Sequence, residues 1–170
     1  EQMLDEFNAL YERGWRGAVF IVDDNFIGNK AQVKQFLPSL MQWMKERRFP
    51  FSLLTEASVN LADDDELLRL MVEAGFKKVF VGIETPCQES LVECNKFHNT
   101  RGNMEEAIRR IQHFGLEVMG GFIVGFDSDP LDIFEKQIAF IQKSGIVIAM
   151  VSLLGALPKT RLYNRLKKEG

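Results

Sequence analysis

The chain has 170 residues, of which 46% are hydrophobic and 26% charged, as expected for one globular domain with a sizeable core. A net charge of -3 gives no electrostatic reason to expect a nucleic-acid partner. The apolar stretches have the length of strands, so no transmembrane span is expected. Two cysteines are too few for a disulfide framework, which favours a reducing, cytoplasmic setting.

Five short apolar runs recur roughly 30 residues apart, which is the average length of one unit in a (β/α) barrel. They are near-continuous rather than alternating, a pattern typical of parallel strands whose outer face is covered by helices. The runs begin at Ala18, Phe51, Val79, Val118 and Val147.

Amphipathic segments between and around these runs predict helices, with capping residues at their starts and glycines at their ends. The expected caps are Asp63 or Asp64, Asn103 and Asp129, with Pro130 in the first turn that follows Asp129. The expected stops are Gly75, Gly115 and Gly145. The helices are expected at about 2–13, 31–48, 64–74, 103–114, 130–144 and 159–169.

Strands and helices alternate throughout, which predicts an α/β fold: a parallel, partial TIM-like barrel with about five strands and outer helices. Five strands do not close an eight-stranded barrel. The chain is therefore expected to be a truncated barrel from a longer protein, with at least one strand missing. Its first apolar run, residues 18–22, would then have one unpaired edge, and either self-association through that edge or a displaced first helix is expected.

Polar residues follow three of the runs at the point where each strand would end. They are Asp23, Asp24 and Asn25 after the first run, Glu56 after the second, and Glu84 with Thr85 after the third. In (β/α) barrels the carboxyl ends of the strands build the active site, so this clustering favours a functional site. The alternatives are an Asx turn, which would explain one of the two aspartates, and a structural ion pair between Glu84 and a neighbouring Lys or Arg.

Glycines interrupt the fourth run, in Gly120-Gly121-Phe-Ile-Val-Gly125-Phe-Asp127. Glycine in a strand often marks the close approach of a ligand, so a flat ring could lie against the bare backbone of Gly125. Tight packing or a β-bulge explains the same glycines equally well.

The two cysteines, Cys87 and Cys94, are expected at one short helix and lack the spacing of a metal site. We interpret them as free, partly buried thiols. No metal ligand and no catalytic residue is assigned from the sequence.

Several ordered motifs resemble the radical S-adenosylmethionine (SAM) superfamily. The resemblance covers nearly the whole chain and is closest to the branch usually fused to an N-terminal cobalamin-binding domain, in its hopanoid-methylase-like group. The motifs are VDDNF (22–26), TEAS (55–58), ELLRLMVEAGFKKVFVGIET (66–85), GGFIVGFDSDP (120–130) and LPKTRLY (157–163). The family commonly has Pro-Gly-Thr where this chain has Pro158-Lys159-Thr160.

The resemblance implies a partial (β/α)6 barrel that binds SAM. It places the stretch around Asp24 near the methionine moiety, Glu84 near the ribose or amino group, and the stretch from Gly121 to Gly125 against adenine. The expected cofactor-binding residues are Asp23, Asp24, Asn25, Glu56, Glu84, Thr85, Gly121, Ile123, Gly125 and Phe126.

The family's Cys-x3-Cys-x2-Cys motif, which holds a 4Fe–4S cluster, is absent from this chain. Residues 1–170 are therefore expected to form a radical SAM core barrel without its first strand and cluster loop, inactive alone. The resemblance implies that the parent enzyme uses the cluster and cobalamin, held outside this chain, to cleave SAM reductively and to methylate or otherwise modify a small-molecule or lipid substrate. It also implies a further C-terminal segment.

Two other functions fit the same residues. The first is a divalent-metal lyase with Asp23, Asp24, Glu56 and Glu84 as oxygen ligands. The second is a barrel without a cluster that acts as an interaction scaffold.

Overall fold

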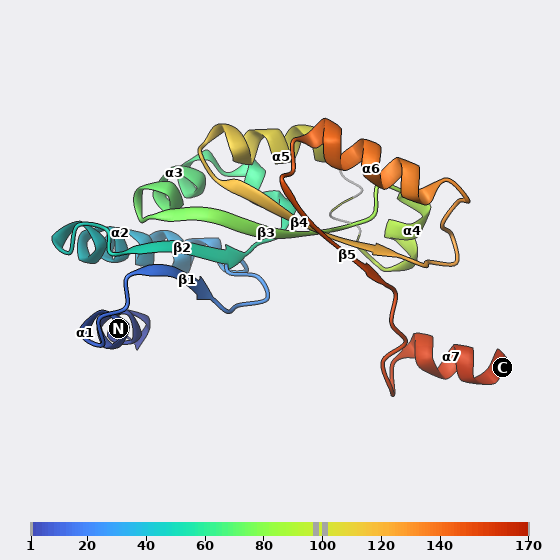
Figure 1. The fold of residues 1–170 in the computed structure, drawn as a ribbon, viewed down its shortest axis with the longest axis horizontal. Coiled ribbons are helices and arrows are strands. Elements are labelled where there is room, and N and C mark those ends of the chain that lie inside the picture. The colour runs from blue at the N-terminus through green and yellow to red at the C-terminus, as the bar shows by residue number, and fades with distance from the viewer. Residues whose placement is uncertain (1, 97–98, 100–101, 170) are drawn as a thin grey trace.

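The structure, a computed structural model, describes residues 2–96, 99 and 102–169. Its centre is one sheet of five parallel strands in the order β1-β2-β3-β4-β5, curved into a half-barrel (Figure 1). The predicted fold class is therefore confirmed. The strands are β1 (Gly17–Ile21), β2 (Phe51–Glu56), β3 (Phe76–Glu84), β4 (Glu117–Val124) and β5 (Ile148–Leu153).

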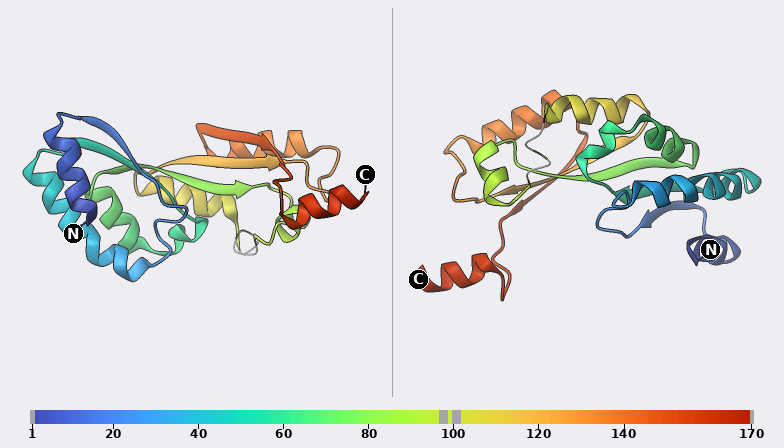
Figure 2. Two further views of the ribbon diagram at one scale, coloured as in Figure 1. Left: turned by 90° about the horizontal axis from the view of Figure 1, so that it is seen from below. Right: turned by 180° about the vertical axis from the view of Figure 1, so that it is seen from behind.

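Seven α-helices and one 3-10 helix are found among the described residues. Figures 1 and 2 show α3, α5 and α6 on one face of the sheet and α7 extended away from the sheet at the C-terminal end. None of these helices is long and apolar enough to cross a membrane. The helices are α1 (Gln2–Glu12), α2 (Lys30–Glu46), η1 (Val59–Asp63), α3 (Asp65–Glu73), α4 (Gln88–Glu93), α5 (Met104–His113), α6 (Ile133–Ser144) and α7 (Arg161–Glu169).

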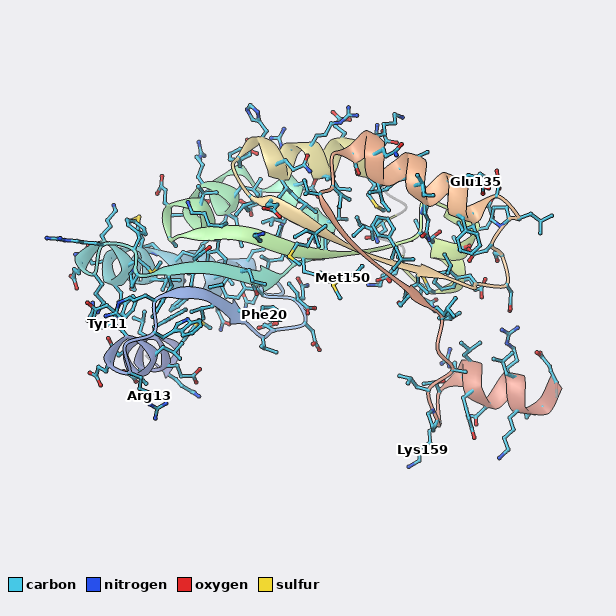
Figure 3. All side chains as sticks on the ribbon, viewed as in Figure 1. Tyr11, Arg13, Phe20, Glu135, Met150 and Lys159 are labelled. Atoms are coloured by element: carbon cyan, nitrogen blue, oxygen red, sulfur yellow. The ribbon has the colours of Figure 1, made fainter. Side chains whose placement is uncertain are left out.

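The two faces of the sheet differ in burial. Val79, Val81 and Ile83 of β3 point toward the helices and are fully buried. The opposite face is open, and Figure 3 shows Phe20 and Met150 on it, with exposed fractions of 45% and 58%. Burial along each central strand therefore alternates even though its sequence is almost continuously apolar.

The helix boundaries follow the expected capping chemistry at most ends. The Asp64 side chain accepts a hydrogen bond from Leu67 N (3.1 Å), and the Asn103 side chain accepts one from Glu106 N (3.3 Å). Gly75, Gly115 and Gly145 follow α3, α5 and α6 with positive φ, as the sequence predicts.

The expected start of α6 is wrong. The helix begins at Ile133 rather than at Pro130, and Asp132 rather than Asp129 occupies its cap position. Asp129 lies three residues earlier, where its carboxylate binds backbone N–H groups of the loop after β4. The aspartate that looked like a helix cap therefore stabilises a different turn.

β1 pairs only with β2, so within the described part of the chain its other edge carries no strand. Helix α1 nevertheless packs against α2 and β2. The Phe7 ring is 3% exposed and lies 5.7 Å from the Trp43 ring and 5.9 Å from the Phe51 ring. The predicted unpaired edge of β1 is therefore present, whereas the first helix is packed in place and is not displaced.

We expect this chain to self-associate through the β1 edge, because a row of unpaired backbone groups is a template for another strand. Light scattering should show a mass that rises with concentration, and exchange of the amides of residues 18–22 should slow in parallel. Phe20→Lys places a charge beside the edge and should keep the chain monomeric. A mass that stays monomeric at every concentration would contradict the prediction.

Candidate functional site

The carboxyl ends of β1, β2 and β3 meet around a pocket of about 270 Å³. Four of the residues expected to bind a cofactor line it: Asp24, Asn25, Glu56 and Glu84. The structure therefore brings together residues that are up to 60 positions apart because parallel strands end at one edge of the sheet. The other lining residues are Ala57, Ser58, Phe80, Gly82 and Lys96.

Hydrogen bonds fix the loop that carries Asp24 and Asn25. Asn25 N donates to Asp23 Oδ1 (2.9 Å), which is an Asx turn, and Asn25 Oδ1 accepts from Ser58 N (3.1 Å) and Ser58 Oγ (3.2 Å). Phe26 N donates to Glu56 O (3.0 Å), so the loop is joined to the end of β2 at two points. Asp23 does not line the pocket but forms the turn and borders a groove between α1 and β1.

Glu84 forms an ion pair at this edge, and its side chain is 14% exposed. Its Oε1 atom lies 2.8 Å from Lys96 Nζ. The ion pair with a Lys or Arg, which the sequence analysis gave as the alternative to a functional role, is therefore present, and its partner is Lys96. Gly82 makes room for it, because a Cβ at that position would lie 2.8 Å from Glu84 Oε1.

Two carboxylates hold the loop after β4. Asp129 Oδ2 accepts from Gly125 N (2.7 Å) and Phe126 N (3.0 Å), while Asp129 Oδ1 accepts from Ser90 Oγ (2.7 Å). Glu93 accepts from the next two backbone N–H groups, at 3.2 and 2.9 Å. Helix α4 is thereby joined to the loop that is expected to contact adenine, although neither carboxylate was predicted to have this role.

The remaining predicted residues do not line the 270 Å³ pocket. A Cβ on Gly121 would lie 2.6 Å from Phe80 Cζ, so the Phe80 ring already covers this glycine. Gly125 has φ 104, a conformation that favours glycine, and Phe126 borders a separate hollow beside α7. Ile123 O accepts a hydrogen bond from the buried Gln137 (2.9 Å). Fully buried Thr85 accepts one from Cys87 N through its hydroxyl (3.2 Å).

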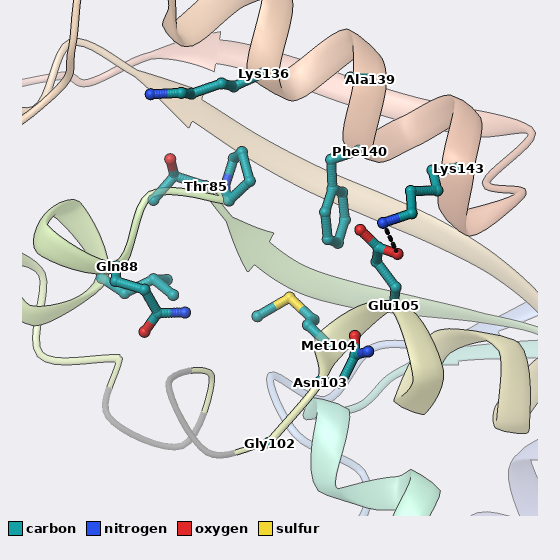
Figure 4. A pocket seen from close by; sticks show the side chains of 12 residues that line it. Thr85, Gln88, Gly102, Asn103, Met104, Glu105, Lys136, Ala139, Phe140 and Lys143 are labelled. Atoms are coloured by element: carbon teal, nitrogen blue, oxygen red, sulfur yellow. Dashed lines mark ion pairs between the residues drawn. The ribbon is translucent and has the colours of Figure 1, made fainter.

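A larger pocket of about 500 Å³ lies among α4, α5 and α6 (Figure 4). One side of it is bridged by Lys143 Nζ and Glu105 Oε2, 2.9 Å apart. Of the predicted cofactor-binding residues, only Thr85 lines this pocket. We therefore place the candidate site in the smaller pocket, where carboxylates from three strand ends converge.

The cysteines flank α4 as its two cap residues, and both are free thiols. Burial raises the pKa of the Cys94 thiol, and the nearby Glu84 carboxylate acts in the same direction, which keeps this sulfur protonated at neutral pH. Among the described residues, no group of three or more His, Cys, Asp or Glu side chains is arranged to hold a metal ion.

Lys159 has φ 72, the left-handed conformation that glycine adopts without strain. Lys159 therefore has the backbone conformation that the glycine of a Pro-Gly-Thr sequence would adopt easily. The next residue, Thr160, caps α7 by accepting a hydrogen bond from Tyr163 N (3.2 Å).

No family model matches the chain. It is 48% identical over 99% of its length to an uncharacterized methyltransferase of Synechocystis sp., and 43% identical over its whole length to the hopanoid C-2 methylase of Rhodopseudomonas palustris. These matches cover 31% and 32% of those two proteins, so the chain spans about a third of the curated relatives it matches.

Solved structures share the fold, among them two radical SAM enzymes. The radical SAM methyltransferase TsrM from Kitasatospora setae, with cobalamin and a 4Fe–4S cluster bound, superimposes with a TM-score of 0.78 at 18% identity, over 98% of this chain and 33% of that one. The radical SAM enzyme coproporphyrinogen III oxidase from Escherichia coli gives 0.54 at 16% identity, over 79% and 31%. The resemblance to radical SAM enzymes of the hopanoid-methylase-like group is therefore confirmed, in sequence by a hopanoid methylase and in fold by two radical SAM enzymes.

Proposed function

We propose that residues 1–170 form the barrel segment of a longer radical SAM enzyme that methylates a small-molecule or lipid substrate. The observation that carries this proposal is the similarity, along nearly the whole of this chain, to proteins named as a methyltransferase and a methylase. In this proposal the cluster loop, a cobalamin-binding domain and a C-terminal segment belong to the rest of the enzyme, and the barrel alone is inactive.

The chemistry of the strand-end pocket fits SAM. Among the described residues that line the pocket, Asp24, Glu56 and Glu84 outnumber the one cation, Lys96, so these residues attract a positively charged group such as the ammonium or sulfonium of SAM. Its volume of about 270 Å³ suits one end of a ligand rather than all of it, because whole ligand sites usually measure about 300–1,000 Å³.

In the proposed complex, Asp24 and Asn25 bind the methionine end and Glu84 accepts hydrogen bonds from the ribose or amino group. Gly121, Ile123, Gly125 and Phe126 form the wall for adenine, with the Phe80 ring supplying the surface over Gly121. Bound SAM supplies the methyl group and, on reductive cleavage, the radical. The barrel positions SAM and excludes water.

The cysteines of this chain do not fit a 4Fe–4S cluster. Cys87 and Cys94 are the two cysteines of the sequence and lie at opposite ends of α4, so they cannot supply the three thiolates of a Cys-x3-Cys-x2-Cys motif. We therefore assign no step through the cluster to these residues. Nor does the geometry favour a metal lyase, because Glu84 is already paired with Lys96 and the carboxylates do not form a ligand set.

The proposal is tested by calorimetry with SAM on the full-length parent protein, purified without oxygen. We expect saturable binding of SAM, and weaker binding of S-adenosylhomocysteine, because that analogue lacks the positive sulfonium that the acidic pocket would attract. Labelled SAM should then transfer its methyl group in the presence of a reductant and the substrate. A parent protein that binds no SAM would overturn the proposed function.

A further inference from the structure

The described lining of the strand-end pocket includes three carboxylates and one lysine, Lys96, and the contacts of this lysine suggest a defined role. Lys96 Nζ lies 2.8 Å from Glu84 Oε1, and the two side chains are 37% and 14% exposed. A flexible lysine in such a pocket could compete with a cationic ligand for Glu84, or it could hold Glu84 in place for that ligand. The backbone around Lys96 distinguishes these two roles.

A Schellman motif at the end of α4 fixes the start of the Lys96 segment. Asn95 has φ 59, the left-handed conformation that this motif requires, and its N–H donates to Val92 O (3.1 Å). Lys96 N then donates to Leu91 O (2.9 Å). The Cα of Lys96 is thus set by helix termination and does not swing with a loop.

Asn99 links Lys96 to the end of β3. Its backbone N–H donates to Lys96 O (2.9 Å), and its side-chain Nδ2 donates to Gly82 O (3.0 Å) and Ile83 O (3.2 Å). Asn99 is 2% exposed, so these bonds are shielded from water. They bind the two carbonyl groups that precede Glu84.

Glu84 itself sits in a position that needs such support. The pairing of β3 with β4 is irregular between Gly82 and Glu84, and Glu84 has φ 67, which is uncommon for a residue with a side chain. Asn99 therefore constrains the backbone before Glu84, and Lys96 constrains the Glu84 carboxylate. Both halves of the ion pair are held before any ligand arrives.

We propose that Lys96 is a positioning residue for Glu84. Its ammonium fixes one carboxylate oxygen and leaves the other to accept hydrogen bonds from a ligand group that carries N–H or O–H donors. Fixing the carboxylate in advance reduces the side-chain entropy that ligand binding would otherwise remove. This inference rests on the proposed function in taking SAM as the ligand, whereas the ion pair itself can be tested without SAM.

The first test measures the affinity of the full-length parent for SAM. We expect Lys96→Met to weaken binding about tenfold and Lys96→Arg to restore part of it, since a hydrogen bond involving a charged group contributes about this much. In a Glu84→Gln background, Lys96→Met should have little further effect, because Lys96 acts through Glu84. Lys143→Met, which breaks the comparable ion pair with Glu105 at 2.9 Å on the helix face, is the matched control and should leave affinity unchanged.

Tighter binding by Lys96→Met would show that the lysine competes with the ligand, and additive losses in the double variant would show that it acts independently of Glu84. Either result overturns the inference while the proposed function survives. The second test needs no SAM: limited acetylation of this chain, read by mass spectrometry, should modify Lys96 severalfold faster in Glu84→Gln than in the unchanged chain. An unchanged rate of Lys96 acetylation, with folding verified by circular dichroism, would overturn the ion pair itself.

Discussion

Replacing Glu84 with alanine in the full-length parent is expected to weaken SAM binding by about ten- to a hundredfold. A hydrogen bond to a charged group contributes about 1.5–3 kcal/mol, which corresponds to that range. The substitution also removes one of the three carboxylates that line the pocket, so the pocket attracts a cationic ligand less strongly. Affinity should be measured by calorimetry at fixed ionic strength.

Glu105→Ala is the matched control, because Glu105 makes an ion pair of similar length with Lys143 but lies in the pocket on the helix face. We expect its SAM affinity to equal that of the unchanged protein. Thermal unfolding should be recorded for both variants, so that loss of binding is separated from loss of structure. Full SAM affinity in a folded Glu84→Ala variant would remove Glu84 from the site.

The order of the secondary structure was predictable because its signals are local. Strand-length apolar runs, caps such as Asn103 and left-handed stops such as Gly145 are each determined within a few residues. The strand ends were predictable for a related reason. In a parallel sheet every carboxyl end lies at the same edge, so Asp24, Glu56 and Glu84 had to be neighbours once the fold was known.

The contacts that shape the site were not predictable, because they join residues distant in the sequence. Asp129 looked like a helix cap but accepts hydrogen bonds from Gly125, Phe126 and, 39 positions away, Ser90. Nothing in the sequence distinguishes Lys96 from the other lysines as the partner of Glu84.

Two glycines show that a glycine in or after a strand does not by itself indicate a ligand-binding site. Gly121 is covered by the Phe80 ring, and Gly125 has a positive φ, which favours glycine whether or not a ligand binds there. A Gly125→Val variant would therefore strain the backbone as well as fill space, and its effect on SAM affinity alone could not be attributed to adenine.

The aromatic residue beneath the Asp24 loop should have the largest effect on stability. Phe26 is 5% exposed, its ring centroid lies 5.4 Å from that of fully buried Phe76, and its N–H donates to Glu56 O. Phe26→Ala removes this ring and leaves a cavity, so we expect the free energy of unfolding to fall by about 3–5 kcal/mol. Urea denaturation followed by circular dichroism measures the loss.

Phe134→Ala on α6 is the control, because Phe134 is 59% exposed and its truncation should change stability by no more than about 0.5 kcal/mol. Phe26→Leu keeps most of the buried volume and should lose less than about 1.5 kcal/mol. The loop that Phe26 anchors carries Asp24 and Asn25 into the strand-end pocket, so in the parent protein Phe26→Ala should also weaken SAM binding, and Phe26→Leu should largely preserve it. A Phe26→Ala protein as stable as the Phe134→Ala control would mean that the loop is held by its hydrogen bonds to Glu56 and Ser58 rather than by burial of this ring.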